Sequence, residues 1–280
     1  MKEFWIAQRT IYPALFRVMI GLVLFLDLIS TYSSGGILFN PVFNGFLPET
    51  GIASFLAEHY QLFSVGYGIV LIAFILGVGK NLTSFLVFCF HLVVMEMTFS
   101  LMTWGDIILK FSLLYFVLAD SFKYLSLQKS NGNLSFISQL AVWSIILHLF
   151  LVYLNNAYFK ILDKDWQQGI AVFYSFSQYS GFQDSFWYSI LSHKFMANFI
   201  NYFIIFQQLT FVPLVLWKKS RKLAIIVSIF IHIIMMFQFG LWKFEIIVIL
   251  LYGFLLNDRE WRKLLPAWFQ KKYLPELNSN

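Results

Sequence analysis

The chain has 280 residues, of which 59% are hydrophobic and only 12% are charged, with a net charge of +6. Soluble domains carry roughly 25% charged residues, so this composition excludes an ordinary water-soluble protein. The basic residues form short clusters between apolar runs, which argues against a nucleic-acid-binding face and favours topology signals beside anionic lipid headgroups.

Apolar runs of membrane-crossing length recur along the chain. A spanning helix needs roughly 20 mostly apolar residues, or about 17 at the short end. The predicted helices cover residues 13–32, 61–78, 82–102, 106–121, 136–154, 197–217, 223–240 and 243–256. The sequence therefore predicts an all-α integral membrane protein, a polytopic bundle of about eight transmembrane helices.

The basic clusters predict the orientation of these helices. They precede the first helix, occupy the connections after residues 78, 121 and 217, and follow the last helix. If the helices alternate in direction, all of these segments lie on one side, which the positive-inside rule makes the cytoplasm. We therefore expect a multi-pass protein of the plasma membrane with both termini cytoplasmic.

Two long loops, 33–60 and 155–196, fall on the opposite, outer side of this topology. They are rich in Tyr, Trp, Phe and Gly, so we expect them to fold over the outer ends of the helices.

The chain shows no repeat or second globular domain, and we expect a transmembrane domain over residues 1–257 and a cytoplasmic interfacial tail over 258–280. Trp261, Leu264, Leu265 and Trp268 recur on one helical face, which predicts a short helix at the bilayer surface. The only cysteine, Cys89, allows neither an internal disulfide nor a cysteine-based metal site.

Ionisable groups within the predicted spans are functional candidates, because burying a charge in lipid is costly. The ones that the topology places in the outer half are Asp27, Glu96, Asp106, Lys110, Lys243, Glu245 and, just past the fifth helix, Lys160. Their shared depth suggests a cavity that opens outward. As alternatives, Asp106 and Lys110 neutralise each other on one helix face, and Lys243 and Glu245 extend to the interface.

Three histidines, His91, His148 and His232, lie near mid-membrane on different predicted helices. A three-histidine metal site is one reading. The absence of an H-x-x-H or H-x-x-x-H pair favours the other, in which neutral histidines hydrogen-bond to a neighbouring helix.

One segment carries a family resemblance. The stretch VYLNNAYFKILDKDWQQG, residues 152–169, leads into AVFYSF and resembles the signature of the HTTM ("horizontally transferred transmembrane") superfamily, which includes the membrane portion of vitamin K-dependent γ-carboxylase. FRVMIGLVLFLDLISTY, ILGVGKNLTSFL and WGDIILKFSLLYFVLADS resemble other parts of that family in the same order. QQLTFVPL, His232 and Phe244 resemble its late helices, so the resemblance spans nearly the whole chain.

The resemblance implies a reaction in which a lysine removes a proton from a reduced lipid quinone, vitamin K in the carboxylases. Lys160 matches this lysine when a gap of one residue is allowed. A lysine is a base only in its neutral form, which an apolar site at the membrane surface favours. Asp106 or Glu96 would orient the amine, although a close carboxylate would also keep it charged.

The chain departs from the carboxylases at three places. They carry two adjacent lysines where this chain has Lys160 and Ile161, and a His-Tyr pair where it has Ser100, Leu101 and Met102. Their large lumenal substrate-binding region has no counterpart here. These departures argue against glutamate carboxylation itself.

The short form of the chain and the W-x-x-G-x-A-V-x-Y run, residues 166–174, also resemble the sporulation-delaying protein B group, whose members help to mature a small secreted peptide. The leading hypothesis is therefore an enzyme or maturation factor that acts on a secreted peptide or a lipid quinone at the outer face. Its predicted site residues are Lys160, Asp106, Glu96, Trp166 and, in support, His232.

Two alternatives remain. The first is a non-enzymatic receptor, immunity or assembly subunit for a secreted peptide, with Lys160 an interfacial lysine in a solvated turn beside Asp163, Lys164 and Asp165. The second, a transporter, is disfavoured because no span is clearly broken by paired Gly and Pro and the halves show no evident repeat.

Overall fold

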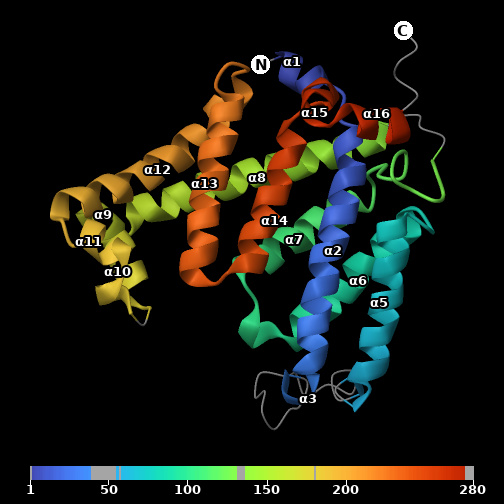
Figure 1. Cartoon of the computed structure of the whole chain (residues 1–280), viewed down its shortest axis with the longest axis horizontal. Helices are drawn as coiled ribbons and strands as arrows, with labels where there is room; N and C mark the ends of the chain where they lie inside the picture. Colours follow the sequence, from blue (N-terminus) through green and yellow to red (C-terminus); the bar gives the residue numbers. More distant parts are fainter. Residues whose placement is uncertain (1, 39–54, 57, 131–135, 180, 275–280) are drawn as a thin grey trace. The chain divides into compact units, whose positions relative to one another are not determined.

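The computed structural model describes residues 2–38, 55–56, 58–130, 136–179 and 181–274. Every secondary-structure element in this part of the chain is helical (Figure 1). The chain forms two compact units. We call them unit 1, Met1–Trp5 with Leu147–Trp242, and unit 2, Ile6–Ile146 with Lys243–Asn280.

All eight apolar segments predicted from the sequence form helices. In chain order they are α2 (Ile11–Ser33), α5 (Tyr60–Leu76), α6 (Asn81–Met97), α7 (Trp104–Phe116), α8 (Phe136–Leu162), α12 (Lys194–Leu216), α13 (Arg221–Phe239) and α14 (Trp242–Tyr252). Short 3₁₀ turns, η1 (Phe99–Leu101) and η3 (Gly253–Leu255), follow α6 and α14. Because α8 runs past its predicted end at residue 154, Lys160 lies inside this helix.

Four of these helices, α2, α8, α12 and α13, are long and apolar enough to cross a membrane by length and composition. Helices α5 and α6 are apolar but have only 17 residues each, and α7 and α14 are shorter. The structure therefore supports an all-helical protein with several membrane-crossing helices.

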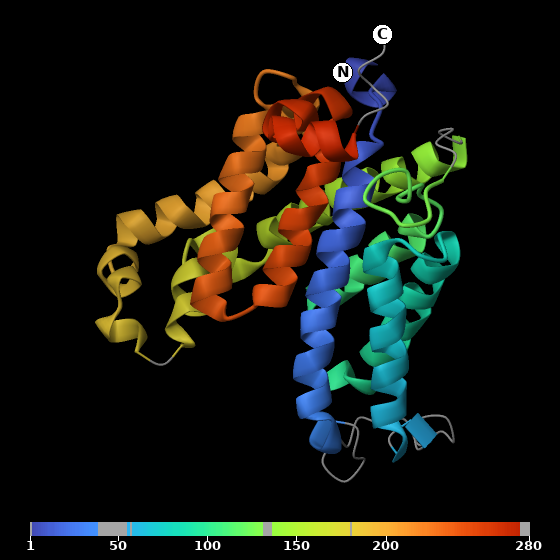
Figure 2. The same ribbon diagram turned by 45° about the vertical axis from the view of Figure 1, so that its right-hand side comes forward.

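Unit 2 is built around α2. This helix packs along α5, α5 packs against α6, and α6 packs against α7; α2 and α5 lie side by side in both ribbon views (Figures 1 and 2). The ring of Phe16 in α2 lies 5.1 Å from that of Phe116 in α7 and 4.9 Å from that of Phe254 in η3, and all three rings are buried. This aromatic cluster joins helices that are far apart in the sequence.

A buried arginine closes one end of α5. Arg17 Nη1 donates a hydrogen bond to the Phe74 carbonyl oxygen at 2.7 Å, and Arg17 Nη2 donates to the Leu125 carbonyl oxygen. The last carbonyl groups of a helix have no partner within it, and a guanidinium group carries several N–H donors that can satisfy them. Arg17 therefore fastens α2 to the end of α5 and to the segment after α7.

The tail continues unit 2 as two short helices, α15 (Asp258–Leu264) and α16 (Ala267–Tyr273). Trp261 of α15 stacks on Tyr12 at the start of α2, with ring centroids 4.8 Å apart. The predicted tail helix is therefore present, but it is broken into two at Pro266. Proline has no backbone N–H to donate a helical hydrogen bond.

Unit 1 contains the second half of α8 together with α12 and α13. Between α8 and α12, the predicted loop 155–196 folds as α9 (Lys164–Gln168), α10 (Ala171–Ser177), η2 (Phe182–Asp184) and α11 (Phe186–Leu191). These short helices surround a buried apolar cluster of Val172, Phe176, Phe182, Leu191 and Ala197. We call this part the aromatic subdomain, because Trp166, Phe173 and Trp187 pack against the same cluster.

Two further short helices complete the described chain, α1 (Lys2–Ile6) and α3 (Gly35–Leu38). The other predicted loop, 33–60, lies largely outside the described residues, so its predicted fold stays a prediction.

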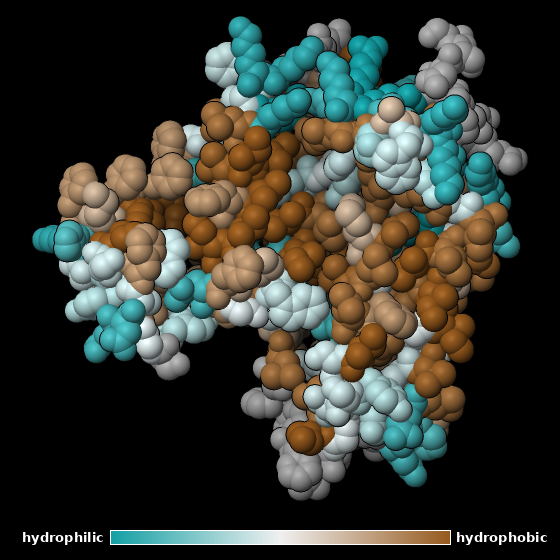
Figure 3. All heavy atoms as spheres, in the orientation of Figure 1, coloured by the Kyte–Doolittle hydropathy of each residue, from teal (hydrophilic) through white to brown (hydrophobic). Residues whose placement is uncertain are grey.

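The long helices expose large apolar side chains. In unit 2 these include Leu22 and Leu26 of α2 and Leu62 and Ile69 of α5, and hydrophobic residues cover this region in Figure 3. Such a surface is costly in water and favourable against lipid acyl chains.

Candidate functional site

The five predicted site residues are divided between the two units. Asp106 and Glu96 belong to unit 2, whereas Lys160, Trp166 and His232 belong to unit 1. A joint site of all five stays a prediction, and each unit has its own polar cluster.

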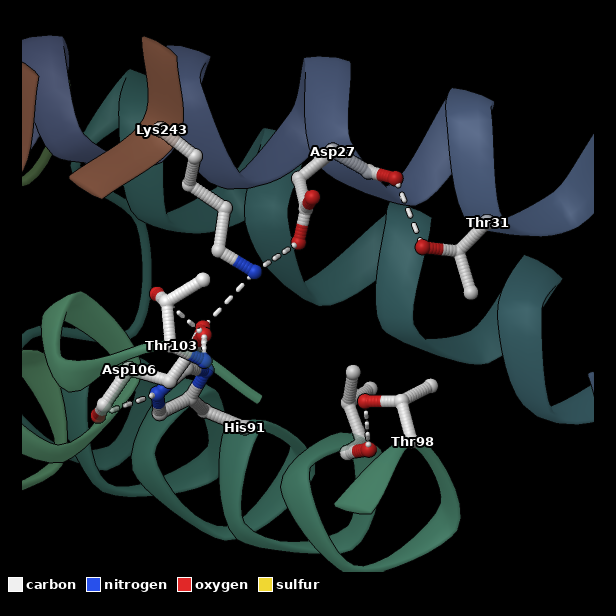
Figure 4. Close-up of polar contacts among 8 residues, drawn as sticks. Asp27, Thr31, His91, Thr98, Thr103, Asp106 and Lys243 are labelled. Carbon is white, nitrogen blue, oxygen red and sulfur yellow. Dashed lines mark hydrogen bonds and ion pairs between the residues drawn. The ribbon is translucent and has the colours of Figure 1, made fainter. Parts of the chain in front are cut away.

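In unit 2, Lys243 at the start of α14 bridges two carboxylates from distant parts of the sequence. Its Nζ atom lies 2.8 Å from Asp27 Oδ2 of α2 and 2.7 Å from Asp106 Oδ1 of α7 (Figure 4). The side chains of Lys243 and Asp27 are 20% exposed and that of Asp106 is 6% exposed. We call these three residues the ionic cluster.

The local fold of α7 holds Asp106 in place. Thr103 precedes the helix with extended backbone, and both its backbone N–H and its hydroxyl donate to Asp106 Oδ2 at 2.8 Å. Asp106 also stands in the first turn, where the helix dipole favours a negative charge. One carboxylate oxygen therefore closes the helix end, and the other is left for Lys243.

A glycine allows α7 and α14 to approach. A Cβ atom on Gly105 would lie 2.7 Å from Phe244 Cα, which is closer than real side-chain contacts. Only glycine lets the two backbones meet at this distance. Because Gly105 precedes Asp106 and Phe244 follows Lys243, this contact brings the two charged residues together.

His91 of α6 adds a fourth helix to this region. It is buried, and its Nε2 atom lies 3.4 Å from the backbone carbonyl oxygen of Asp106. Figure 4 shows its ring beside Asp106, on the side away from Asp27. This contact agrees with the prediction that the histidine bonds to a neighbouring helix.

The other polar residues predicted at this depth do not join the ionic cluster. Lys110 lies over the ring of Phe111, with Nζ 4.9 Å from the ring centroid, so it does not neutralise Asp106. Glu96 is exposed at the end of α6 and bonds to none of the described residues. Glu245 is fully buried, so its predicted extension to the interface is wrong.

In unit 1, Lys160 lies near the end of α8 and faces Trp166. Its Nζ atom is 4.9 Å from the centroid of the indole ring, a cation–π contact. Asp163 separates α8 from α9, and its carboxylate accepts hydrogen bonds from the backbone N–H groups of Asp165 and Trp166 at 2.9 and 3.1 Å. This N-cap turns the chain so that Trp166 comes back over Lys160.

Residues of α12 fix the position of Trp166. Asn201 Nδ2 donates to the Trp166 carbonyl oxygen at 2.8 Å, and the Tyr202 hydroxyl donates to the Gln167 carbonyl oxygen at 2.7 Å. Gly169 ends α9 with φ of 78°, and a Cβ atom there would collide with Asn198 Oδ1. The turn at the end of α9 therefore requires glycine, and the hydrogen bonds from Asn201 and Tyr202 hold it against α12.

Lys160 has no acidic partner among the described residues. Asp163, Lys164 and Asp165 are exposed, and Asp163 is engaged in the N-cap. The exposed turn of the alternative hypothesis, in which Lys160 is only an interfacial lysine, is thus present at residues 163–165. Lys160 is half-buried against the indole ring instead of forming an ion pair in that turn.

His232 of α13 lies elsewhere in unit 1. Its Nε2 atom is 3.4 Å from the hydroxyl of Tyr153, whose ring stacks on Phe211 of α12 at 3.8 Å. Tyr153 precedes Lys160 by two helical turns, or about 10 Å along α8. His232 therefore contacts Tyr153, and its predicted support of Lys160 stays a prediction.

The ion pairs of Lys243, the contact of Gly105 with Phe244 and the role of Asn201 were not predicted from the sequence. The only signal for Lys243 was its shared depth with Asp27 and Asp106.

In the described part of the chain, no group of three or more His, Cys, Asp and Glu side chains is arranged to hold a metal ion. No protein-family model, curated protein or solved structure matches the chain.

Proposed function

We propose that this protein is an HTTM-like integral membrane protein that modifies or matures a secreted peptide, or acts on a lipid quinone, at the outer face of the plasma membrane. Lys160 is the base in this proposal. Its neutral amine accepts a proton from an acidic O–H or C–H group of the substrate and becomes an ammonium ion.

The observation that carries the proposal is the environment of Lys160. An ion pair would hold the amine in its charged form, and no carboxylate among the described residues provides one. The Trp166 ring, 4.9 Å away, stabilises a cation by roughly 0.5–2 kcal/mol, which is less than a buried carboxylate provides. The amine is therefore held less firmly in its charged form than that of a lysine paired with carboxylates, and the ring stabilises the cation that forms when it accepts a proton.

Lys243 shows the opposite environment. Its two ion pairs, at 2.7 and 2.8 Å, keep it charged and engaged, so it does not suit the role of a base. This contrast favours Lys160 over Lys243 and assigns Asp106 to the ionic cluster. Asp106 is thus proposed as a positioning residue of unit 2.

The proposed topology has eight spans, both termini in the cytoplasm and the aromatic subdomain outside. Eight apolar helices and the placement of the basic clusters support it. A substrate that arrives from the outer leaflet or the outer solution would then reach Lys160 at the base of the aromatic subdomain.

The alternative is a non-enzymatic receptor, immunity or assembly subunit for a secreted peptide. It is supported by exposed aromatic side chains of the aromatic subdomain, including Tyr174, Tyr179, Phe186 and Tyr188. In that case the Lys160–Trp166 contact serves only to fix the turn between α8 and α9.

The variant Lys160→Arg separates the two functions. Arginine keeps the positive charge and the cation–π contact, but it does not become neutral at ordinary pH. Mass spectrometry of the peptides secreted by cells that express each variant together with the neighbouring genes is the readout. We expect the modified or matured peptide with the native protein and with the control Lys164→Gln, and its loss with Lys160→Arg. An unchanged peptide with a normally expressed Lys160→Arg protein would support the non-enzymatic role.

A further inference from the structure

The tail helices α15 and α16 have two different faces. The inner face consists of Trp261, Leu265 and Phe269, which pack against a buried cluster that contains Ile11, Tyr124 and Leu274. The single apolar face expected from the sequence is therefore divided, since Leu264 and Trp268 point away from this cluster and are 56% and 66% exposed.

The outer face combines these two apolar residues with positive charge. Trp268, Lys271 and Lys272 lie one turn apart on α16, so they share a face. On α15, Arg259 and Lys263 are also one turn apart, and both are exposed beside Leu264. We call these six residues the basic–apolar face.

We propose that the basic–apolar face docks on anionic lipid headgroups of the membrane in which the protein is inserted. Exposed Trp and Leu side chains surrounded by Lys and Arg are the composition that binds a negatively charged bilayer surface, with the rings at headgroup depth. This inference rests on the proposed membrane location.

The position of the tail favours a lipid over a soluble acidic partner. Trp261 stacks on Tyr12, which lies in the first turn of α2, one of the helices long enough to cross a membrane. The tail is thus held at the level where that helix would leave the bilayer. Figures 1 and 3 agree, since α15 and α16 lie at a hydrophilic end of unit 2, beyond the apolar residues of α2.

The tail is also fastened to the chain just before α2. Asp258 accepts hydrogen bonds from the backbone N–H groups of Thr10 and Ile11 at 2.8 and 3.0 Å, and from the Thr10 hydroxyl at 2.8 Å. Arg9 Nε donates to the Phe254 carbonyl oxygen at 2.8 Å. Lipid bound by the tail is therefore coupled to the first turn of α2, and docking should stabilise unit 2 as a whole.

A spin label tests the docking in the full chain. Cys89 is replaced by Ala, and a nitroxide is attached to Cys at position 267, an exposed alanine beside Trp268. The protein is reconstituted in nanodiscs of phosphatidylcholine, or of equal parts of phosphatidylcholine and phosphatidylglycerol. The accessibility of the label to oxygen, which concentrates in the bilayer, is compared with its accessibility to a water-soluble relaxation agent.

We expect the label to gain oxygen accessibility and lose aqueous accessibility when phosphatidylglycerol is present. The combined change Lys263→Gln, Lys271→Gln and Lys272→Gln should abolish this difference, since each lysine near an anionic surface contributes roughly fivefold to binding. The matched control removes three exposed lysines, Lys218 and Lys219 between α12 and α13 and Lys222 at the start of α13, and should keep the difference.

The outcomes separate this proposal from the membrane location. A label that reports the same environment in both lipids, in protein that has entered the nanodiscs, overturns the docking only. A difference that persists in the triple tail variant overturns it as well. Protein that does not enter nanodiscs at all contradicts both the membrane location and the docking.

Discussion

Gly105 and Phe244 lie in backbone contact, such that a Cβ atom on residue 105 would be 2.7 Å from Phe244 Cα. We predict that Gly105→Ala separates α7 from α14 and weakens the ion pair of Asp106 with Lys243. Overpacking of a buried contact costs about 1–3 kcal/mol, so the melting temperature of the detergent-solubilised protein should fall.

The control for this prediction is Gly66→Ala in α5. The added methyl group would meet only Phe90 at 3.8 Å, an ordinary contact. Alanine is a better helix former than glycine by about 0.5–1 kcal/mol, so this variant should be neutral or more stable. Equal melting temperatures for the two variants would contradict the close approach at Gly105.

Removal of Lys243 should destabilise unit 2 more than removal of a neighbouring lysine. In Lys243→Met, the carboxylates of Asp27 and Asp106 face each other without a cation. Breaking a buried ion pair costs about 3–5 kcal/mol and an exposed one below about 1 kcal/mol, so we expect roughly 2 kcal/mol for this partly exposed cluster. Lys110→Met, which removes a cation–π contact with Phe111 and no ion pair among the described residues, is the control.

A second variant shows whether the loss comes from uncompensated charge. Replacement of both carboxylates in the same protein, Asp27→Asn and Asp106→Asn with Lys243→Met, removes the repulsion, so more than half of the lost stability should return. Urea denaturation followed by circular dichroism measures the free energy of unfolding of the native protein, of Lys243→Met and of the charge-neutral variant. If the charge-neutral variant is no more stable than Lys243→Met, the ionic cluster does not stabilise unit 2 through its charges.

Asn201 should control the order of the turn that carries Trp166. Its side chain donates to the Trp166 carbonyl oxygen and accepts from the Val172 backbone N–H, so Asn201→Ala leaves both groups without these bonds. We expect faster amide hydrogen exchange over residues 164–172, measured by mass spectrometry. Tyr202→Phe removes a single, exposed hydrogen bond to Gln167 and should have a smaller effect. Equal exchange in both variants would mean that Asn201 does not hold the turn.

The positions of the helices could be read from the sequence because each consists of an apolar run with clear polar ends. The ends were less predictable. Residues 155–162 look like a loop, since Asn155, Asn156 and Lys160 interrupt the apolar pattern, yet they continue α8 to the Asp163 cap. The polar residues led to a predicted helix end at residue 154. The helix itself continues to Leu162 and ends only where Asp163 caps the start of α9.

The composition of the ionic cluster could not be predicted in the same way. Hydrophobicity predicts a shared depth for Asp27, Asp106 and Lys243, but it does not predict which helices are neighbours. Asp106 and Lys243 are neighbours because α7 packs against α14 at Gly105. The chain has 15 glycines, and nothing in the sequence distinguishes Gly105 as the one at a helix contact. The division of the tail into two faces likewise depends on Tyr12, which is far away in the chain.

The proposed function requires the aromatic subdomain and Lys160 to lie on the outer side of the membrane. In a protein with Cys89→Ala, a cysteine at Lys164 tests this, because Lys164 is exposed and, unlike Asp163, does not cap α9. A cysteine at Lys129, exposed between α7 and α8, is the control for the opposite side. We predict that a membrane-impermeant maleimide labels position 164 in intact cells and position 129 only after the cells are permeabilised. Labelling of position 164 only after permeabilisation would contradict the outer location of Lys160 and with it the proposed function.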